Sequence, residues 1–169
     1  KQLGVLNKLT GEMSGVLDRI LDCGVVAVLR ADSSAELLNV AGALRKGGVV
    51  AIEVTMTTPG ALKVIEEASA KMKDSIIGVG TVLDPETARA AILAGAEYIV
   101  SPTLHLGVIE MAKRYGKVVM PGAFTPTEIL TAWQAGADVV KVFPASVGGP
   151  AYFKDLMGPL PQVRLMPTG

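Results

Sequence analysis

The sequence has few of the residue types that usually indicate a redox role or a metal site. It contains a single cysteine, Cys23, and a single histidine, His105, so it cannot form an internal disulfide and offers little to a zinc ion. Only three Phe, three Tyr and one Trp occur among 169 residues, although half of the chain is hydrophobic. The core must therefore be aliphatic, and the length predicts one domain.

Net charge and long apolar runs are also missing. The 16 basic and 16 acidic residues are scattered along the chain and cancel at pH 7, so we expect neither nucleic acid nor a membrane surface as a partner. Apolar runs such as residues 25–29 are far shorter than the ~20 residues that a membrane span needs. The N-terminus lacks the pattern of a secretory signal, and we expect a cytoplasmic protein.

What the sequence does have is a repeated alternation of apolar runs and helical patterns. The runs are rich in β-branched residues with little polar alternation, which is typical of parallel strands covered on both faces. The helical patterns often open with proline and close on glycine. The predicted strands are residues 25–30, 50–56, 76–82, 98–102, 118–123, 139–144 and 164–167. The predicted helices are residues 34–46, 59–72, 85–94, 106–115, 126–135 and 150–157.

Strict β/α alternation with short turns favours an α/β fold of the TIM (β/α)8 barrel type over an open doubly wound sheet. No complete Gly-x-Gly-x-x-Gly motif follows the first strand, which weakens a dinucleotide-binding alternative. An apolar helical face precedes that strand and is formed by Met13, Val16, Leu17, Ile20 and Leu21. We therefore predict a helical segment over residues 1–24 that packs on a barrel over residues 25–169.

Two ionisable residues lie inside the predicted buried strands, Glu53 in the second and Lys141 near the end of the chain. Burial lowers the pKa of a lysine, and a partly neutral lysine can form a Schiff base with a carbonyl while a carboxylate moves protons. The alternative is a buried ion pair without chemistry. Because desolvating both ions makes such a pair a poor stabiliser, the pattern favours a catalytic role for Lys141 and Glu53.

Six short motifs follow one another from about residue 25 to the last residue. They are Glu53-Val54-Thr55, Gly78-Val79-Gly80-Thr81-Val82-Leu83, Ser101-Pro102, Pro121-Gly122, Lys141-Val142-Phe143-Pro144-Ala145 and Pro167-Thr168-Gly169. In this order the chain resembles the 2-keto-3-deoxy-6-phosphogluconate (KDPG) aldolase family. The resemblance implies a cytoplasmic class I aldolase, assembled as a homotrimer, that splits KDPG into pyruvate and glyceraldehyde 3-phosphate in the Entner-Doudoroff route. It implies no metal or other cofactor.

The resemblance also assigns roles by motif position. Lys141 would be the Schiff-base lysine, and Glu53 would be the acid/base that acts through a water molecule. Four positions match those that line the pyruvate site, and Arg30 would face the substrate carboxylate or hydroxyls. The four positions are Thr81, Pro102, Phe143 and Thr168. With Thr57 and Gly169 added, the expected substrate-binding residues are Arg30, Thr57, Thr81, Pro102, Phe143, Thr168 and Gly169.

The chain departs from the family pattern in two places. Thr57 stands where some members carry an arginine, which bears on substrate preference. The family also continues past its Pro-Thr-Gly motif with a further strand and helices, whereas seven strands are predicted here and a closed barrel has eight. We therefore expect an incomplete view of a longer protein, seen through strand seven, in which part of the phosphate site is absent.

Several alternatives remain open. A 2-keto-3-deoxy-6-phosphogalactonate aldolase fits Arg30 and Thr57 about as well, because sequence does not separate the two epimers. A phosphosugar isomerase or epimerase on the same scaffold would use carboxylate bases and form no imine. A non-catalytic assembly subunit would keep Lys141 and Glu53 as an ion pair. His105 follows the fourth strand, and we expect it to serve at the surface or as a helix cap.

Overall fold

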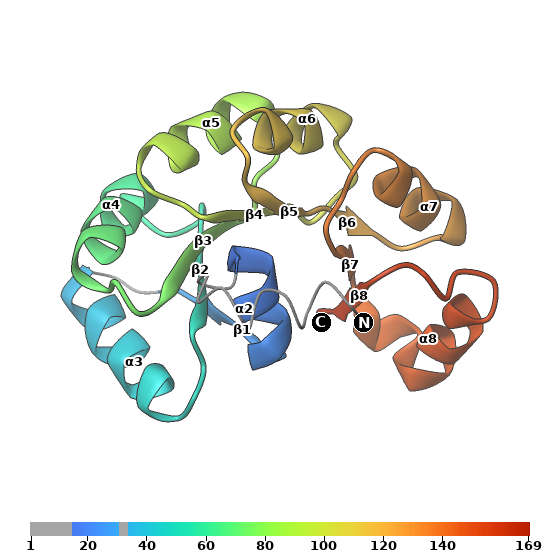
Figure 1. Cartoon of the computed structure of the whole chain (residues 1–169), viewed down its shortest axis with the longest axis horizontal. Coiled ribbons are helices and arrows are strands. Elements are labelled where there is room, and N and C mark those ends of the chain that lie inside the picture. Colours follow the sequence, from blue (N-terminus) through green and yellow to red (C-terminus); the bar gives the residue numbers. More distant parts are fainter. Residues whose placement is uncertain (1–14, 31–33) are drawn as a thin grey trace, which may run out of the picture.

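The computed structural model describes residues 15–30 and 34–169, in which parallel strands alternate with helices (Figure 1). The strands are β1 (Val26–Leu29), β2 (Ala51–Thr55), β3 (Ile76–Gly80), β4 (Tyr98–Val100), β5 (Val118–Met120), β6 (Gly122–Ala123), β7 (Val140–Val142) and β8 (Leu165–Pro167). The helices are α2 (Val16–Cys23), α3 (Ser34–Lys46), α4 (Ala61–Lys71), α5 (Pro85–Leu93), α6 (Leu106–Arg114), α7 (Pro126–Gln134) and α8 (Gly149–Met157). A short 3-10 turn spans Ala145–Val147.

Two parallel sheets make up the curved inner wall, with helices α3 to α8 following one another around its outer side (Figure 1). One sheet has the order β1-β2-β3-β4-β5 and the other β6-β7-β8. The predicted strand 118–123 is divided at Pro121, which has no amide hydrogen to donate to a ladder. The prediction of a (β/α) barrel seen through strand seven is confirmed, and element ends agree with it within two residues.

Local signals explain where the helices begin and end. Thr125 and Glu128 form a capping box at the start of α7, whose first residue is a proline. Asp84 caps α5 by accepting a hydrogen bond from the backbone amide of Thr87 at 2.6 Å. After α5, Gly95 has a φ of 110°, a conformation that a residue with a side chain rarely adopts. The chain can therefore turn directly into β4.

Helix α2 packs against the inner residues of the strands rather than on the outer ring. Ile20 is buried and belongs to a cluster with Ala51, Ile76, Tyr98, Val100, Met120 and Val139. Val16 and Leu17 pack on the same cluster. Leu21, which was predicted on this face, is instead 44% exposed, because the helix turns it toward an open cavity. Met13, with the rest of residues 1–14, lies outside the described part of the chain.

Strand β1 is one edge of the first sheet and β8 is one edge of the second, and they do not pair with each other within residues 15–30 and 34–169. Cavities of about 330 and 150 Å³ lie between them and are lined by residues of both strands. Val25 and Val28 are about half exposed as a result. In the same described ranges, no helix has the length and apolar character required to cross a bilayer.

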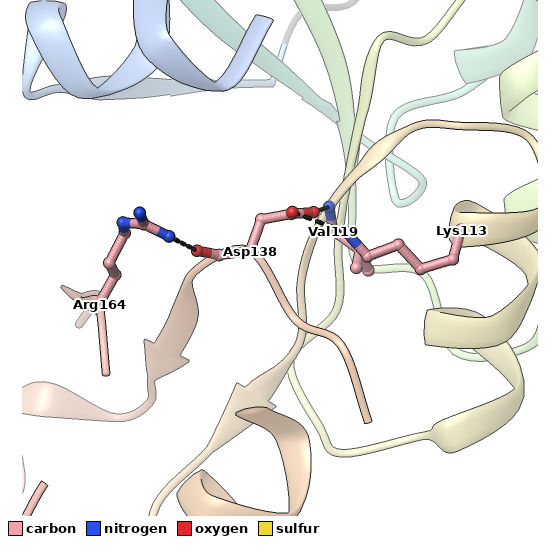
Figure 2. A network of polar contacts seen from close by, with 4 residues as sticks. All are labelled: Lys113, Val119, Asp138 and Arg164. Carbon is pink, nitrogen blue, oxygen red and sulfur yellow. Dashed lines mark hydrogen bonds and ion pairs between the residues drawn. The ribbon is translucent and has the colours of Figure 1, made fainter. Parts of the chain in front are cut away.

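Asp138 joins the two sheets at the start of β7 (Figure 2). Its carboxylate accepts a hydrogen bond from the Val119 amide of β5 at 2.8 Å and pairs with the Lys113 ammonium of α6 at 2.6 Å. Its backbone carbonyl accepts a hydrogen bond from the Arg164 guanidinium at 3.4 Å. One side chain thus ties a helix and a strand of the first sheet to the strand that carries Lys141.

Replacing Asp138 by alanine should lower the free energy of unfolding by about 1–3 kcal/mol, because the Val119 amide and the Lys113 ammonium both lose an ionised acceptor. Urea unfolding measures the change. The matched control is Asp155→Ala, which removes an exposed carboxylate from α8 and should shift stability by at most about 0.5 kcal/mol. Equal effects of the two substitutions would show that the Asp138 contacts contribute nothing.

Candidate active site

Lys141 is the central residue of β7, and its side chain points into the interior with only 7% of the residue exposed. It lies in register with Gly122 of β6 on one side and Met166 of β8 on the other. Its ammonium sits 5.0 Å from the ring centroid of Phe143. Desolvation lowers the pKa of Lys141, and the nearby Glu53 carboxylate opposes that change. The amine is therefore easier to deprotonate than an exposed lysine.

Glu53 is the central residue of β2 and is 3% exposed. Burial raises the pKa of its carboxyl group, while Lys141 and, to a smaller degree, Arg30 act in the opposite direction. The carboxyl also lines the 330 Å³ cavity that it shares with Thr168 and Gly169. A buried acid with a raised pKa beside a lysine with a lowered pKa is a common arrangement at catalytic sites.

The two groups influence each other but do not touch. Within the described residues, the ion pairs with nitrogen and oxygen atoms less than 4.0 Å apart do not include Lys141 with Glu53. A structural salt bridge would require that contact, so the ion-pair alternative that the sequence left open lacks its main feature.

Gly80, the last residue of β3, makes the position of Glu53 possible. A Cβ atom at residue 80 would overlap Oε1 of Glu53, so the carboxyl occupies the space where a side chain would otherwise stand. The same strand meets Tyr98 in the same way, because a Cβ at Gly78 would overlap the phenol ring. Both positions require glycine because a side chain from a neighbouring strand approaches β3 closely, and not because the chain turns there.

Thr81 follows Gly80 and has a φ of 59°. This left-handed conformation is rare for a β-branched residue and costs about 1–3 kcal/mol. Strain of this kind persists where surrounding contacts impose it, and it often marks a functional site. The hypothesis that Thr81 lines the site is therefore consistent with its backbone.

The other predicted residues also follow the C-terminal ends of strands, but not all of them lie against Lys141 or Glu53. Arg30 is exposed after β1 and close enough to Glu53 to affect its pKa. Phe143 lies against Lys141 after β7. Pro102 instead packs on the backbone of Gly122, where a Cβ would overlap its carbonyl. Thr57 is exposed, and its hydroxyl lies 2.8 Å from that of Thr55.

Thr168 and Gly169 follow β8, whose register is fixed by a hydrogen bond from the Thr168 amide to the Val142 carbonyl at 3.1 Å. They line a second cavity of about 550 Å³ together with Ser146, Gly149, Pro150 and Phe153. The linings of the two cavities share Pro167, Thr168 and Gly169.

Tyr98 is a residue of the site that the sequence analysis missed. It is fully buried on β4, its hydroxyl has no hydrogen-bond partner in the described chain, and burial raises its pKa well above the ordinary value. The Glu53 carboxylate adds to that rise. The phenol ring lies against Gly78, two residues before the Gly80 that Glu53 approaches. The Gly-x-Gly pattern of β3 was the available signal, since glycine inside a strand indicates a closely approaching neighbour.

Metal ligands do not cluster in the described ranges: no group of three or more His, Cys, Asp and Glu side chains is placed to hold an ion. His105 is the N-cap residue of α6, and its side chain makes no capping hydrogen bond. The reactive groups that the described residues bring near each other are thus an amine and a carboxyl group, and the carboxyl-bearing Glu53 lines a cavity.

Comparison with known proteins shows which family the chain is similar to. The family of KDPG and KHG aldolases matches residues 16–169. The 2-dehydro-3-deoxy-phosphogluconate aldolase of Pseudomonas aeruginosa is 38% identical over 146 residues, which is 86% of this chain and 66% of that protein. The 2-dehydro-3-deoxy-6-phosphogalactonate aldolase of Escherichia coli is 39% identical over 138 residues, covering 81% of this chain and 67% of that protein.

A solved structure agrees with these relatives. The KDPG aldolase of Legionella pneumophila, with pyruvate captured as a covalent carbinolamine intermediate, has a TM-score of 0.78 and 32% identity over 85% of this chain and 69% of that one. The chain belongs to the KDPG/KHG aldolase family, so the predictions of this family and of the lyase class are confirmed. It spans about two thirds of the length of the two curated relatives.

Proposed function

We propose that the protein containing this chain is a class I aldolase that cleaves KDPG to pyruvate and glyceraldehyde 3-phosphate. The observation that carries the proposal is Lys141, a buried amine with a lowered pKa, held near the Glu53 carboxyl without an ion-pair contact. Desolvation raises the neutral fraction of the amine, which is the form that attacks a carbonyl. Family membership and the carbinolamine seen in the Legionella enzyme support the same chemistry.

In the proposed reaction, Lys141 Nζ adds to the C2 carbonyl of the substrate to give a carbinolamine. Loss of water, with Glu53 supplying the proton through a water molecule, leaves a protonated imine. The Glu53 carboxylate, ionised by that step, then takes the C4 hydroxyl proton through the water molecule. The C3–C4 bond breaks, and its electron pair moves into the imine to form an enamine. Glyceraldehyde 3-phosphate leaves, and protonation at C3 followed by hydrolysis releases pyruvate and the free lysine.

The substrate-binding roles form part of the proposal. Thr81, Pro102, Phe143 and Thr168 would line the pyruvate part of the site, with Gly169 beside them. Arg30 and Thr57, both exposed beyond the ends of β1 and β2, would meet the polar remainder of the substrate. The epimer 2-keto-3-deoxy-6-phosphogalactonate is the second candidate, since one of the relatives is named for it. Relative kcat/KM on the two sugar acids decides between them.

Assembly and location complete the proposal. We infer a homotrimer in the cytoplasm, acting in the Entner-Doudoroff route, from the family pattern that the motifs follow. Light scattering on the purified protein tests the trimer through its mass, and a monomer at micromolar concentration would contradict it.

The Schiff base is tested by incubating the full-length protein with pyruvate, reducing with borohydride and mapping the adduct by peptide mass spectrometry. We expect one modified lysine, Lys141, because its pKa is lowered by burial. Lys154, an exposed lysine of α8, is the internal control and should remain unmodified. The isomerase and the non-catalytic subunit form no imine, so a folded protein without an adduct would refute the aldolase in favour of one of them.

A further inference from the structure

A basic cavity of about 490 Å³ lies between α3 and α4, away from Lys141. Its lining residues are Leu38, Gly42, Arg45, Lys46, Lys71, Met72, Lys73, Asp74 and Ser75. Ser75 directly precedes β3, whereas Thr81 follows the other end of that strand. The cavity is therefore at the N-terminal end of the strands, opposite the proposed active site.

Positive charge exceeds negative charge in the wall of this cavity. Four cationic side chains face one lining carboxylate, that of Asp74, which pairs with Arg45 at 2.6 Å. Lys71 pairs with Glu67 at 3.4 Å, and the Lys73 ammonium donates to the Ser69 carbonyl at 3.0 Å. Lys46 makes no ion pair or hydrogen bond with the described residues.

Basic residues in the last turn of a helix often only balance the helix dipole. The C-terminal ends of α3 and α4 together carry the equivalent of about one negative charge, since each end contributes about half. With the Asp74 and Glu67 carboxylates, the negative total still falls short of the four cations. The dipoles therefore explain part of the cluster and leave about one positive charge without a counter-charge.

Ser75 provides an independent indication of a ligand. The residue is only 4% exposed, and its hydroxyl has no hydrogen-bond partner in the described part of the chain. Its backbone amide is satisfied by the Met72 carbonyl at 3.0 Å, so the orphan group is the side chain alone. Buried polar atoms in folded proteins nearly always have a partner, and Ser75 is one of the residues that line this cation-rich cavity.

We propose that the basic cavity binds a small organic phosphate, with Lys46, Lys71 and the Ser75 hydroxyl as its anion-binding groups. Cations and a hydroxyl donor suit phosphate oxygens, directly or through a water molecule. Leu38 and Met72, which pack on the hydrophobic core, form an apolar wall for the carbon part of the ligand. The volume lies within the range of about 300–1,000 Å³ that is usual for small-molecule sites.

Phenyl phosphate, which combines a phosphate with an apolar ring, is the probe that tests the site at low ionic strength. We expect saturable one-to-one binding by calorimetry and a shift of the Met72 methyl resonance by NMR. The double variant Lys46→Gln/Lys71→Gln should raise Kd at least tenfold. Ser75→Ala, which removes only the hydroxyl, should raise it several-fold. The control Lys63→Gln/Lys154→Gln removes two exposed helical lysines outside the cavity and should change Kd less than twofold.

The outcomes separate this site from other binding. Absence of saturable binding, or a Met72 resonance that does not move, would overturn the proposal. An equal loss of affinity in both double variants would do so as well, because the ligand would then respond to overall charge. An unchanged Kd in Ser75→Ala would remove the hydroxyl from the site. None of these results depends on the borohydride experiment, since Lys141 lies on β7 and is not part of the lining of this cavity.

Discussion

Replacing Lys141 by methionine should reduce aldolase kcat by about 10⁴-fold or more, because the amine that forms the imine is gone and the remaining groups cannot act in its place. Methionine has a similar length and can contact the Phe143 ring that Lys141 now faces. The measurement is a coupled assay of pyruvate release by the full-length protein. Lys141→Arg is the control that keeps the positive charge, and it should be equally inactive. Turnover within tenfold of wild type in either variant would refute the Schiff-base mechanism.

The buried Lys141 and Glu53 should lower the free energy of unfolding of the wild-type protein. Both ions of the proposed catalytic pair are buried without contact, so the double variant Lys141→Met/Glu53→Met should gain about 1–4 kcal/mol in free energy of unfolding. The difference in free energy of unfolding between the double variant and wild type should depend on pH. Wild type loses stability as pH rises through the raised folded pKa of Glu53 and regains it as pH rises from the lowered folded pKa of Lys141 toward the ordinary lysine value. This difference in free energy of unfolding is therefore largest at pH values between the two folded pKa values.

Substituting Gly80 by alanine is expected to produce the second large effect, a loss of about 100-fold in kcat/KM. The new Cβ would overlap Oε1 of Glu53 and force the carboxyl away from Lys141, and small displacements of a catalytic group have costs of this order. Borohydride trapping at Lys141 should still occur, because the amine itself is untouched. It should be slower, because the displaced Glu53 supplies the proton for imine formation less well.

Gly42→Ala is the matched control for that substitution. Gly42 lies within α3, and a Cβ there meets nothing within 4 Å, so activity should stay within twofold while the helix gains slightly in stability. If Gly80→Ala had full activity, Glu53 could be moved without consequence, and its assignment as acid/base would fail.

The sequence was sufficient for the fold because the signals that determine it are local. Glycines such as Gly95 end helices, and Pro85 and Pro126 begin them, so the alternation of elements could be followed along the chain. Lys141 and Glu53 could be selected for a related reason: each is an ionisable residue inside an apolar run, where burial makes a charge costly.

What the sequence could not provide are the contacts between distant segments. The overlap of a Gly80 side chain with Glu53 depends on two neighbouring strands, and the position of the Tyr98 ring against Gly78 depends on a third. The burial of Ser75 beside a basic cavity depends in the same way on helices α3 and α4, and the sequence analysis did not single it out. Leu21 kept helical spacing, yet the cavity at the β1–β8 edge leaves it exposed.

The division of the strands into two sheets has a consequence for how the site forms during folding. Glu53 belongs to the sheet that begins with β1, and Lys141 to the sheet that ends with β8. Each sheet can form its own ladder from segments close in sequence, whereas the acid and the amine meet only when the sheets dock, a contact between distant parts of the chain that closes slowly. Asp138 holds the two sheets together just before β7, so the positions of both reactive residues depend on its carboxylate.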